Sequence, residues 1–499
     1  MAPKSLVTDV EKFVKDLFSR HPAQMVAERK VIHDPILGTN AFEPHEIALI
    51  DLPFCQRLRR ISQTDVASLI YPSANHNRLE HSLGVATIAG KILDSLRQRL
   101  WPGKTDILSS AAVMEVRTAA ILHDIGQGPF SHLTDYIMKQ LPEVIRYRKK
   151  NPNKFSEDKP HEMLSYLIVK SPTFQDYVKH EIVGKYARPE INIDRIAEMI
   201  VAAGERDPLN AWQGNIINGP FDADKLDYLQ RDAYFSGLRI GIDLDRFLNS
   251  VWLDWSSRPR RLKVMTSGAI TLEQILFGKV LLYNTMYHHQ KVLAAECAIQ
   301  GIFEMLRDHP DYKINGRRMD RVIDYLYITE EAILSLDNKP EELKNYIDRF
   351  LRRDLLKRAL VISADTVNKP ETSTGYSQFK DLVEDPDGLR NLRLKLVSAL
   401  NCKYPIYDIW IVLPRTPTFS DEASRAIIQD PGGKPKSLRE PFRVDEWLTA
   451  YWSNKWKGYV FCPAGEAIRK EVAKKAAELF HDEYKFSLNS KAMEQAKIR

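Results

Sequence analysis

The segment RTAAILHDIGQGPFSH (Arg117–His132) is the most informative stretch of this 499-residue chain. Its apolar residues recur at helical spacing and lead to an adjacent histidine and aspartate, His123 and Asp124. Burying such groups without partners costs on the order of several kcal/mol. A metal ion would satisfy both groups, because neutral imidazole and carboxylate form a common ligand mixture for Fe, Mn, Zn or Mg. Gly126 and Gly128 follow, and they allow the backbone to turn sharply and to approach a ligand closely.

Two further segments favour a metal site over the commoner case of a capped or exposed His-Asp pair. Upstream, SANHNRLEHSLGVATIAGKIL (Ser73–Leu93) places His81 on a predicted helix with an apolar stripe. Downstream, GPFDADKLDYLQRDAYFSG (Gly219–Gly237) begins a predicted helix that is dense in carboxylates and includes Asp224 beside Lys225. Together these segments supply one histidine, a His-Asp pair and a later aspartate on separate helices. This combination is a plausible ligand set for one cation.

The composition is that of an ordinary globular protein. Apolar residues make up 44% of the chain and charged residues 28%, and the net charge is only +6. These values argue against disorder and against a dedicated nucleic-acid binder, which would concentrate its basic residues on one face. The four cysteines lie far apart, which fits a reducing cytosol better than a disulfide framework. No apolar run approaches the roughly 20 residues needed to cross a bilayer, so we expect a cytoplasmic protein with no membrane partner.

The length predicts two or three domains. Residues 1–30 are expected to form an amphipathic helix, residues 31–310 the catalytic core, and residues 311–499 a C-terminal helical or α+β region with a regulatory or oligomerisation role. The predicted fold class is mainly α, a helical bundle followed by a region with a few short strands. Helical periodicity falls in 78–100, 115–124, 131–141, 161–169, 221–235 and 273–307.

Other local patterns complete the expected organisation. Residues 403–414 (KYPIYDIWIVLP) and 458–462 (GYVFC) are rich in aromatic and β-branched residues and predict strands. Residues 146–160 are basic and poor in apolar residues, which predicts a loop beside the site. Residues 416–441 contain Pro, Gly and Ser and predict a connector.

Four blocks now identify a resemblance. DLPFCQRLRRISQ (51–63), HNRLEHSLGV (76–85), LHDIGQGPFSH (122–132) and DADKLDYLQRD (222–232) occur in the order and at the spacing found in the deoxynucleoside triphosphate triphosphohydrolases. This branch of the HD superfamily includes bacterial dGTPases and the vertebrate SAM-and-HD-domain enzyme. The resemblance covers roughly residues 31–302. It implies an HD-domain helical bundle that hydrolyses deoxynucleoside triphosphates to deoxynucleoside and inorganic triphosphate.

The resemblance also implies which residues act. It assigns a divalent metal ion, whether Mg, Mn, Fe, Co or Zn, to the ligands His81, His123, Asp124 and Asp224. It makes His132, oriented by Asp135, the proton donor to the leaving 5′-oxygen, and His161 with Glu162 a second catalytic pair. The residues expected to bind substrate are Gln63, Arg78, Gln127, Lys225, Tyr228, Asp232 and His288. A possible allosteric nucleotide would contact Asp51, Gln56 and Arg59, although a salt-bridged loop explains these residues almost as well.

The chain departs from the family pattern at two places. Gln127 stands where a histidine is common, and the segment Leu281–Lys291 lacks the arginines that some relatives present to the outer phosphates, for which Lys279 could compensate. Two alternatives therefore stay open: an HD phosphohydrolase acting on another nucleotide or phosphoester, such as a signalling nucleotide, and a nucleotide-sensing or nucleic-acid-binding module. The family precedent also predicts a homo-oligomer, whether a dimer, a tetramer or a hexamer.

Overall fold

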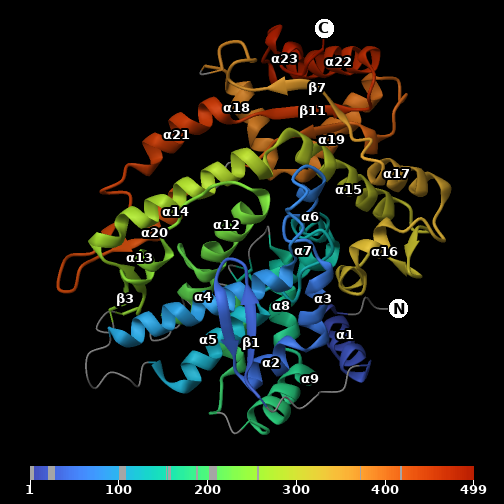
Figure 1. The fold of residues 1–499 in the computed structure, drawn as a ribbon. Coiled ribbons are helices and arrows are strands. Elements are labelled where there is room, and N and C mark those ends of the chain that lie inside the picture. The colour runs from blue at the N-terminus through green and yellow to red at the C-terminus, as the bar shows by residue number, and fades with distance from the viewer. Residues whose placement is uncertain are drawn as a thin grey trace. The chain divides into compact units, whose positions relative to one another are not determined.

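The computed structural model describes residues 5–20, 28–99, 108–152, 154–155, 159–186, 189–201, 211–254, 258–370, 372–415 and 419–498. The described chain is mainly helical with a few short strands, which confirms the predicted fold class (Figure 1). It divides into two compact units. Unit 1 comprises residues 1–282, 314–333 and 421–442, and unit 2 comprises residues 283–313, 334–420 and 443–499. The expected boundary near residue 310 falls inside the first stretch of unit 2.

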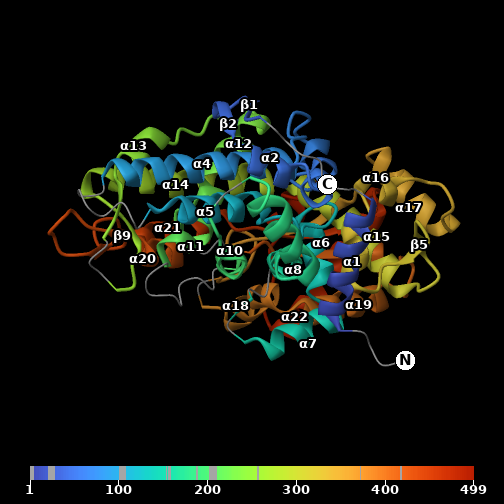
Figure 2. The ribbon, with the colours of Figure 1, turned by 90° about the horizontal axis from the view of Figure 1, so that it is seen from below.

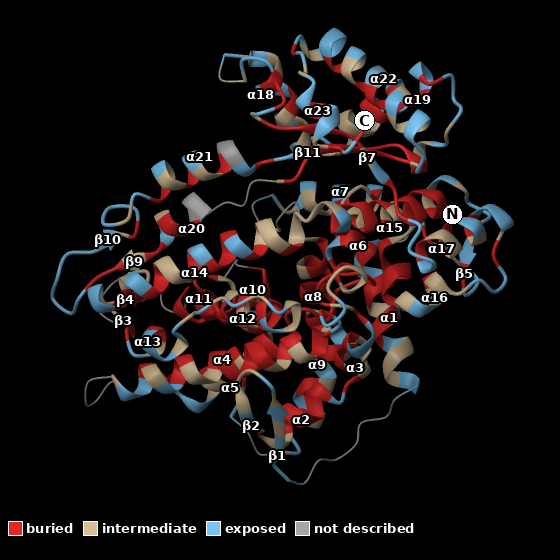
Figure 3. Cartoon of the chain, turned by 45° about the horizontal axis from the view of Figure 1, so that its top comes forward, coloured by how far each residue is buried: buried red, intermediate tan, exposed pale blue. Residues whose placement is uncertain are grey.

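Three helices form the centre of unit 1. Helix α4 (Arg78–Gln98) packs against α5 (Ser110–Leu122) and α12 (Ala223–Ser236), and Figure 2 shows α4 and α5 lying along each other. Each helix begins at a side-chain cap, in which Asn77, Ser109 or Asp222 accepts hydrogen bonds from backbone amides of the first turn. Most of the residues in α4 and α5 are buried (Figure 3). The motif-bearing segments therefore start at well-defined points within a rigid core.

Shorter helices follow the motifs. Helix α6 (His132–Met138) begins at the last residue of the Arg117–His132 segment, and α8 (Pro160–Val169) packs against it. The predicted loop at 146–160 was wrong in its first part, because α7 (Pro142–Lys150) continues to residue 150. Pro142 occupies the first turn, and Glu143 at the start and basic residues at the end complement the helix dipole. These terminal signals outweighed the low apolar content.

Two small sheets belong to unit 1. Strands β1 (Lys30–Asp34) and β2 (Gly38–Phe42) form an antiparallel hairpin that the sequence did not predict, since its exposed strands carry little apolar alternation. The second sheet has the order β10-β9-β4-β3 and joins distant segments: β3 (Val251–Leu253) and β4 (Leu262–Val264) meet β9 (Ile427–Ile428) and β10 (Lys436–Ser437). The expected connector at 416–441 thus contributes strands to the catalytic half of the sequence.

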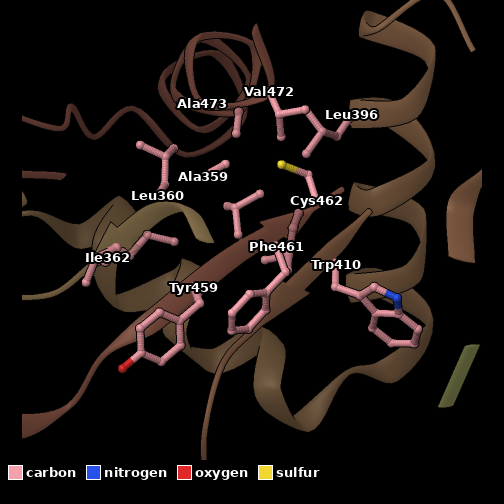
Figure 4. Packing of buried hydrophobic residues seen from close by; sticks show 14 of the residues in the cluster. Ala359, Leu360, Ile362, Leu396, Trp410, Tyr459, Phe461, Cys462, Val472 and Ala473 are labelled. Atoms are coloured by element: carbon pink, nitrogen blue, oxygen red, sulfur yellow. The ribbon is translucent and has the colours of Figure 1, made fainter. Parts of the chain in front are cut away.

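Unit 2 is organised around a three-stranded antiparallel sheet in the order β7-β11-β8. The central strand β11 (Gly458–Cys462) lies where it was predicted, and all five of its residues are buried. Tyr459 and Phe461 point to one side of this sheet, and Val472 and Ala473 of α22 (Glu466–Tyr484) cover the side toward which Cys462 points (Figure 4). Burial on both sides explains why the strand has an unbroken apolar sequence.

The other strands of this sheet were harder to predict. Of residues 403–414 only β8 (Trp410–Val412) pairs as a strand, because Pro405 begins a short 3-10 turn (Ile406–Asp408) instead. Strand β7 (Lys357–Ile362) was not predicted. Its first two residues are basic, which obscures the apolar run that follows. Pairing with β11 decides its conformation.

The remaining helices are short or lie outside the site. They are α1 (Leu6–Arg20), α2 (Pro44–Ile50), α3 (Pro53–Arg57), α9 (Pro172–Tyr177), α10 (Ile193–Ile200), α11 (Ala211–Asn218), α13 (Leu244–Leu248), α14 (Ala269–Leu282), α15 (Gln290–Asp308), α16 (Glu330–Leu334), α17 (Glu341–Leu351), α18 (Thr374–Asp381), α19 (Pro386–Ala399), α20 (Phe419–Arg425), α21 (Val444–Lys455) and α23 (Lys491–Glu494). A short hairpin joins β5 (Lys313–Ile314) to β6 (Arg317–Arg318). Within the described residues, no helix has the length and apolar character required to span a bilayer.

Candidate metal and substrate site

Helices α4 and α5 bring the predicted ligands together. His81 projects from the first turn of α4, and His123 and Asp124 follow the last turn of α5. One nitrogen or oxygen atom from each of these three residues lies within 4.8 Å of the others, and all three are buried. Asp224, in the first turn of α12, places Oδ1 3.0 Å from His81 Nε2. Three segments spread over more than a hundred residues thus converge on one point.

Hydrogen bonds behind the two imidazoles fix which nitrogen faces the cluster. His123 Nδ1 lies 2.8 Å from the carbonyl oxygen of Ala120, which can only accept, so Nδ1 carries the proton. His81 Nδ1 lies 2.8 Å from Asp227 Oδ2 in the same sense. Both Nε2 atoms are buried. His123 Nε2 has no hydrogen-bond partner among the described residues, and His81 Nε2 faces the Asp224 carboxylate, with 3.0 Å to Oδ1. With Nδ1 held by these acceptors, both rings direct Nε2 into the cluster, as metal-binding histidines do.

The ionised carboxylates around the cluster favour a bound cation. Burial lowers the pKa of His81, but the carboxylates of Asp224 and Asp227 reverse this and raise it to about 10. Burial raises the pKa of Asp124, and the neighbouring imidazole of His123 and guanidinium of Arg78 hold it well below its usual range. The carboxylates stay ionised and attract positive charge between them.

A second layer supports His81. Asp227 accepts two hydrogen bonds from Arg231, each 2.8 Å long, and Arg231 also donates to Asp34 Oδ2 at 2.8 Å. A Cβ atom at Gly84 would lie 1.9 Å from Asp227 Oδ1, so this glycine makes room for the contact. The sequence analysis missed Asp227 and Arg231, although their spacing from Asp224 on one helix was a usable signal.

Arg78 lies directly beside the buried cluster. Its Nη1 donates to Asp124 Oδ2 at 2.8 Å and its Nε donates to Ser131 Oγ at 2.7 Å. Its Nη2 lies 3.4 Å from His132 Nε2. Arg78 is only 4% exposed, so its charge is aimed at the cluster and not at bulk solvent.

A second group of titratable residues adjoins the first. Ligand-type atoms of His132, Asp135 and His161 lie within 4.8 Å of one another. Asp135 Oδ2 contacts both rings, at 2.6 Å from His161 Nδ1 and 3.5 Å from His132 Nδ1. His161 Nε2 lies 3.9 Å from Asp124 Oδ1, which connects the two groups. The His132 side chain is 60% exposed and is the accessible member.

Other predicted residues have partners away from the cluster. Glu162 accepts from Lys159 at 2.6 Å and from Asn218 at 3.3 Å, while its neighbour His161 pairs with Asp135. Lys225 Nζ donates to Asp222 Oδ2 at 2.6 Å and to the carbonyl oxygen of Gly219 at 2.9 Å. Lys279 Nζ, offered above in place of the missing arginines, donates to Glu422 at 2.7 Å.

Two glutamines near the cluster retain unsatisfied polar atoms. Gln127 is fully buried, and neither its Oε1 nor its Nε2 has a partner among the described residues. Gln63 Oε1 is in the same condition. Because buried amides are normally hydrogen-bonded, such atoms indicate a missing ligand.

His76 is a site residue that the sequence analysis did not single out. Its Nε2 lies 2.7 Å from Asp232 Oδ1. The backbone carbonyl oxygen of His76 accepts from the backbone amide of Gln63 at 3.0 Å. The ring stacks on Phe235 at 4.6 Å. His76 thus connects Gln63 and Asp232, and its position five residues before His81 in the same motif was the available signal. Tyr228, on the same helix as Asp232, is half-buried.

The predicted effector residues have local partners of their own, and His288 is part of the other unit. Gln56 donates to the carbonyl oxygen of Ile50 at 2.8 Å and accepts from Arg59 Nε at 2.8 Å, while Asp51 is exposed near Lys30. His288 belongs to unit 2, where its ring lies 5.5 Å from Tyr283 and 6.0 Å from Trp452, and burial lowers its pKa to about 4.

Comparison with known proteins agrees with this geometry. The HD domain family matches residues 78–231, and the HD-associated region matches residues 242–483. The chain is 30% identical to an uncharacterized protein of Methanocaldococcus jannaschii, over 64% of this chain and 59% of that protein. It is 27% identical to the deoxynucleoside triphosphate triphosphohydrolase SAMHD1 of Homo sapiens, over 66% of this chain and 54% of that protein. It is 26% identical to the uncharacterized protein YwfO of Bacillus subtilis, over 78% of this chain and 83% of that protein.

The aligned parts leave much of some relatives unmatched. The chain spans about half the length of the SAMHD1 proteins that it matches. The HD match begins at Arg78 and ends at Arg231, so it contains the whole buried cluster. With its His-Asp pair flanked by His81 and Asp224, the chain belongs to the HD superfamily and resembles the deoxynucleoside triphosphate triphosphohydrolases.

Proposed function

We propose that this protein hydrolyses deoxynucleoside triphosphates to deoxynucleoside and inorganic triphosphate, using a divalent cation. The buried cluster of His81, His123 and Asp124 carries the proposal, because its two imidazoles direct buried Nε2 atoms toward one point beside carboxylates that stay ionised. Asp224, 3.0 Å from His81, completes the proposed ligand set. A divalent ion at such a site supplies Lewis acidity, which lowers the pKa of a coordinated water and neutralises phosphate charge.

The polar groups around the cluster suit a triphosphate and a sugar. Arg78 offers a buried guanidinium for phosphate oxygens, and Gln127 offers an unsatisfied amide. We assign Gln63 and Asp232, with Tyr228, to the deoxyribose, since His76 holds the first two residues side by side. The neutral Gln127 amide can donate a hydrogen bond to the α-phosphate but brings no charge to it.

His132 is the proposed general acid. Attack of water on the α-phosphorus forms a new P–O bond and breaks the bond to O5′, and the leaving O5′ needs a proton. The exposed imidazole of His132 has Asp135 at Nδ1, an arrangement suited to proton transfer near neutral pH. His161, held by the same carboxylate at 2.6 Å, stands between His132 and the cluster. We place Glu162 and Lys225 around these groups as supporting residues.

A product assay tests the proposal. Purified protein is incubated with each dNTP and NTP in the presence of Mg²⁺, Mn²⁺, Fe²⁺ or Co²⁺, and products are separated by ion-exchange chromatography. We expect inorganic triphosphate and deoxynucleoside from dNTPs and little turnover of NTPs. Asp124→Ala should abolish turnover, whereas Asp94→Ala, whose side chain is 70% exposed, should not.

Different products would point to the alternatives. Orthophosphate or a nucleoside monophosphate would favour an HD phosphohydrolase acting on another nucleotide or phosphoester. No turnover together with steeply salt-dependent binding to DNA or RNA would favour a binding module.

A cationic cavity in unit 2 supports the proposal of a nucleotide effector. Its volume is about 360 Å³, within the range of roughly 300–1,000 Å³ typical of ligand sites. The charged residues among its lining are all basic: Lys291, Arg353, Lys357, Arg358, Arg469 and Lys497. A polyphosphate fits this charge better than a neutral ligand does. The predicted effector contacts at Asp51, Gln56 and Arg59 and a homo-oligomeric state remain part of the proposal.

Titration with nucleotides checks the effector. Adding GTP or a second dNTP should raise the rate for the first substrate, and Lys357→Glu should remove this activation while leaving basal turnover. Sedimentation with and without nucleotide measures the accompanying assembly.

A further inference from the structure

The turn that leads into His132 has an unusual backbone. Phe130 and Ser131 have φ values of 57° and 47°, in the left-handed region that disfavours residues with a side chain. The sequence suggested Gly126 and Gly128 as the turning residues, but neither has a positive φ. Two adjacent strained residues next to a proposed catalytic histidine persist only where the surroundings hold them.

Glu330 provides that restraint from a distant part of the chain. Its Oε1 accepts from the backbone amides of Phe130, at 2.9 Å, and Ser62, at 2.7 Å. Its Oε2 accepts from Ser62 Oγ at 2.7 Å. One carboxylate thus ties two loops of unit 1 that lie 68 positions apart in the sequence, Ser62 and Phe130. Glu330 belongs to the 314–333 stretch of the same unit.

Both loops continue directly into the site. Ser131 Oγ donates to the carbonyl oxygen of Ser62 at 2.5 Å and accepts from Arg78 Nε at 2.7 Å. Arg78 in turn donates to Asp124 at 2.8 Å. The amide of His132 donates to Asp65 Oδ1 at 2.9 Å, which fixes the start of α6. A displacement of the Phe130–Ser131 turn would therefore change the orientation of the Arg78 and His132 side chains.

We propose that Glu330 is a positioning residue of the hydrolytic site, which holds the Phe130–Ser131 turn so that His132 and Arg78 face the substrate. The inference rests on the proposed function and adds a residue outside the region matched by the HD domain. Glu330 touches no proposed ligand of the metal and acts only through the turn.

The position of the Phe130–Ser131 turn and the folding of the buried cluster depend on different contacts. Removal of the carboxylate leaves the amides of Ser62 and Phe130 and the Ser62 hydroxyl without their acceptor. The metal cluster lies on α4 and α5, which are anchored by their own packing and caps. Metal content should therefore survive a change at residue 330, while the turn relaxes.

Three variants test this on the full-length protein loaded with Mn²⁺. Glu330→Ala removes the acceptor. Glu330→Gln keeps Oε1 for both backbone amides and should rescue. Glu331→Gln is the matched control, because that neighbouring side chain is 78% exposed and its ion pair with Arg60, at 3.7 Å, is a surface contact. The measurements are kcat and KM for the best dNTP, bound Mn²⁺, the melting temperature, and amide deuterium exchange of peptides covering residues 58–66 and 126–138.

We expect Glu330→Ala to lower kcat about tenfold to a hundredfold, as small misplacements of catalytic groups do, with KM changed less than about threefold. Exchange should rise in both peptides, and bound Mn²⁺ should stay at the wild-type level. Glu330→Gln should recover most of kcat, and Glu331→Gln should match wild type.

Several results would overturn the inference. One is unchanged kcat in Glu330→Ala at a temperature where the variant is folded, and another is unchanged exchange at 126–138. Equal loss in the Ala and Gln variants together with lost Mn²⁺ would indicate a general folding defect. If wild type hydrolyses no nucleotide, the proposed function fails, and exchange alone then decides whether Glu330 restrains the turn.

Discussion

Buried charge is arranged in opposite ways in the two units. In unit 2, Arg393 donates to both oxygens of Glu304, at 2.9 and 3.1 Å, and to the carbonyl oxygens of Ile406 and Ile409, and its guanidinium stacks over Trp410. In unit 1, His123 Nε2 and both side-chain amide atoms of Gln127 are buried without partners among the described residues. A saturated pair fixes a fold, whereas an unsaturated cluster is kept for a ligand. The contrast predicts where mutation harms stability and where it harms activity.

The largest effect should follow loss of the acidic ligand. Asp124→Ala removes a carboxylate that stays ionised between cationic groups, so we expect no detectable dNTP hydrolysis and no bound metal. The change also removes the acceptor of Arg78 Nη1, so a modest loss of stability should accompany the loss of metal, while the hydrogen bond to Ser131 still holds the Arg78 side chain. Activity, metal analysis and thermal melting of the same preparation measure these outcomes. An Asp124→Ala protein that melts far below wild type would contradict the expectation that this residue serves activity more than stability.

The converse change in unit 2 should affect folding first. Arg393→Met leaves Glu304 buried and unpaired, which should lower the free energy of unfolding by roughly 3–5 kcal/mol. Adding Glu304→Leu should recover much of that loss. Arg352→Met, at a side chain that is 77% exposed, serves as control. Urea titration gives the free energies, and a single mutant as stable as the control would contradict the expectation.

Gln127 provides a finer test. Gln127→Leu replaces a buried amide without partners by an apolar group of similar size, so the free energy of unfolding should not fall. The ratio kcat/KM should fall roughly tenfold to a hundredfold, because a hydrogen bond to a charged phosphate is lost. Gln140, whose amide donates to the carbonyl oxygen of Tyr136 at 2.7 Å, provides the opposite case. Gln140→Leu should lose stability and keep activity.

The smallest expected effect is a shift in pH dependence. Burial lowers the pKa of His161, but the ion pair with Asp135 outweighs burial and leaves this pKa raised. The protonated ring therefore persists to higher pH in wild type. Asp135→Asn should move the alkaline limb of kcat/KM to lower pH, since the raising contribution is lost. An alkaline limb that does not move, measured beside Asp94→Asn, would exclude His161 as the titrating group.

The sequence predicted the parts of the site that local patterns encode. His81 and Asp224 lie in the first turns of predicted helices and the His-Asp pair follows the end of another, and the structure brings these residues together. Glu330 could not be found in this way, because it meets Phe130 across 200 positions and its own segment has no distinctive pattern. The direction of a side chain was equally hidden, as His161 and Glu162 show by pairing with different residues.

The fold shows the same limit. Helix α4 was predicted to within two residues, and β11 was predicted in full because both of its faces are buried. The helical stretch predicted over 273–307 is instead two helices, α14 and α15, with a π-helical turn at Tyr283–Tyr287 between them. Strand β9 pairs with β4 across more than 160 positions, and a two-residue strand carries no periodic signal. Long-range pairing determines such elements, and short windows of sequence do not contain it.

The interleaved course of the chain has a consequence for biosynthesis. Unit 1 takes its last stretch from residues 421–442, where β9 and β10 extend a sheet begun at β3. A growing polypeptide on the ribosome therefore cannot finish this unit until residue 442 has left the exit tunnel, long after helices α4, α5 and α12 have emerged. During that interval the nascent helices expose apolar surface, so chaperone holding should matter more for this protein than for one whose catalytic half is contiguous.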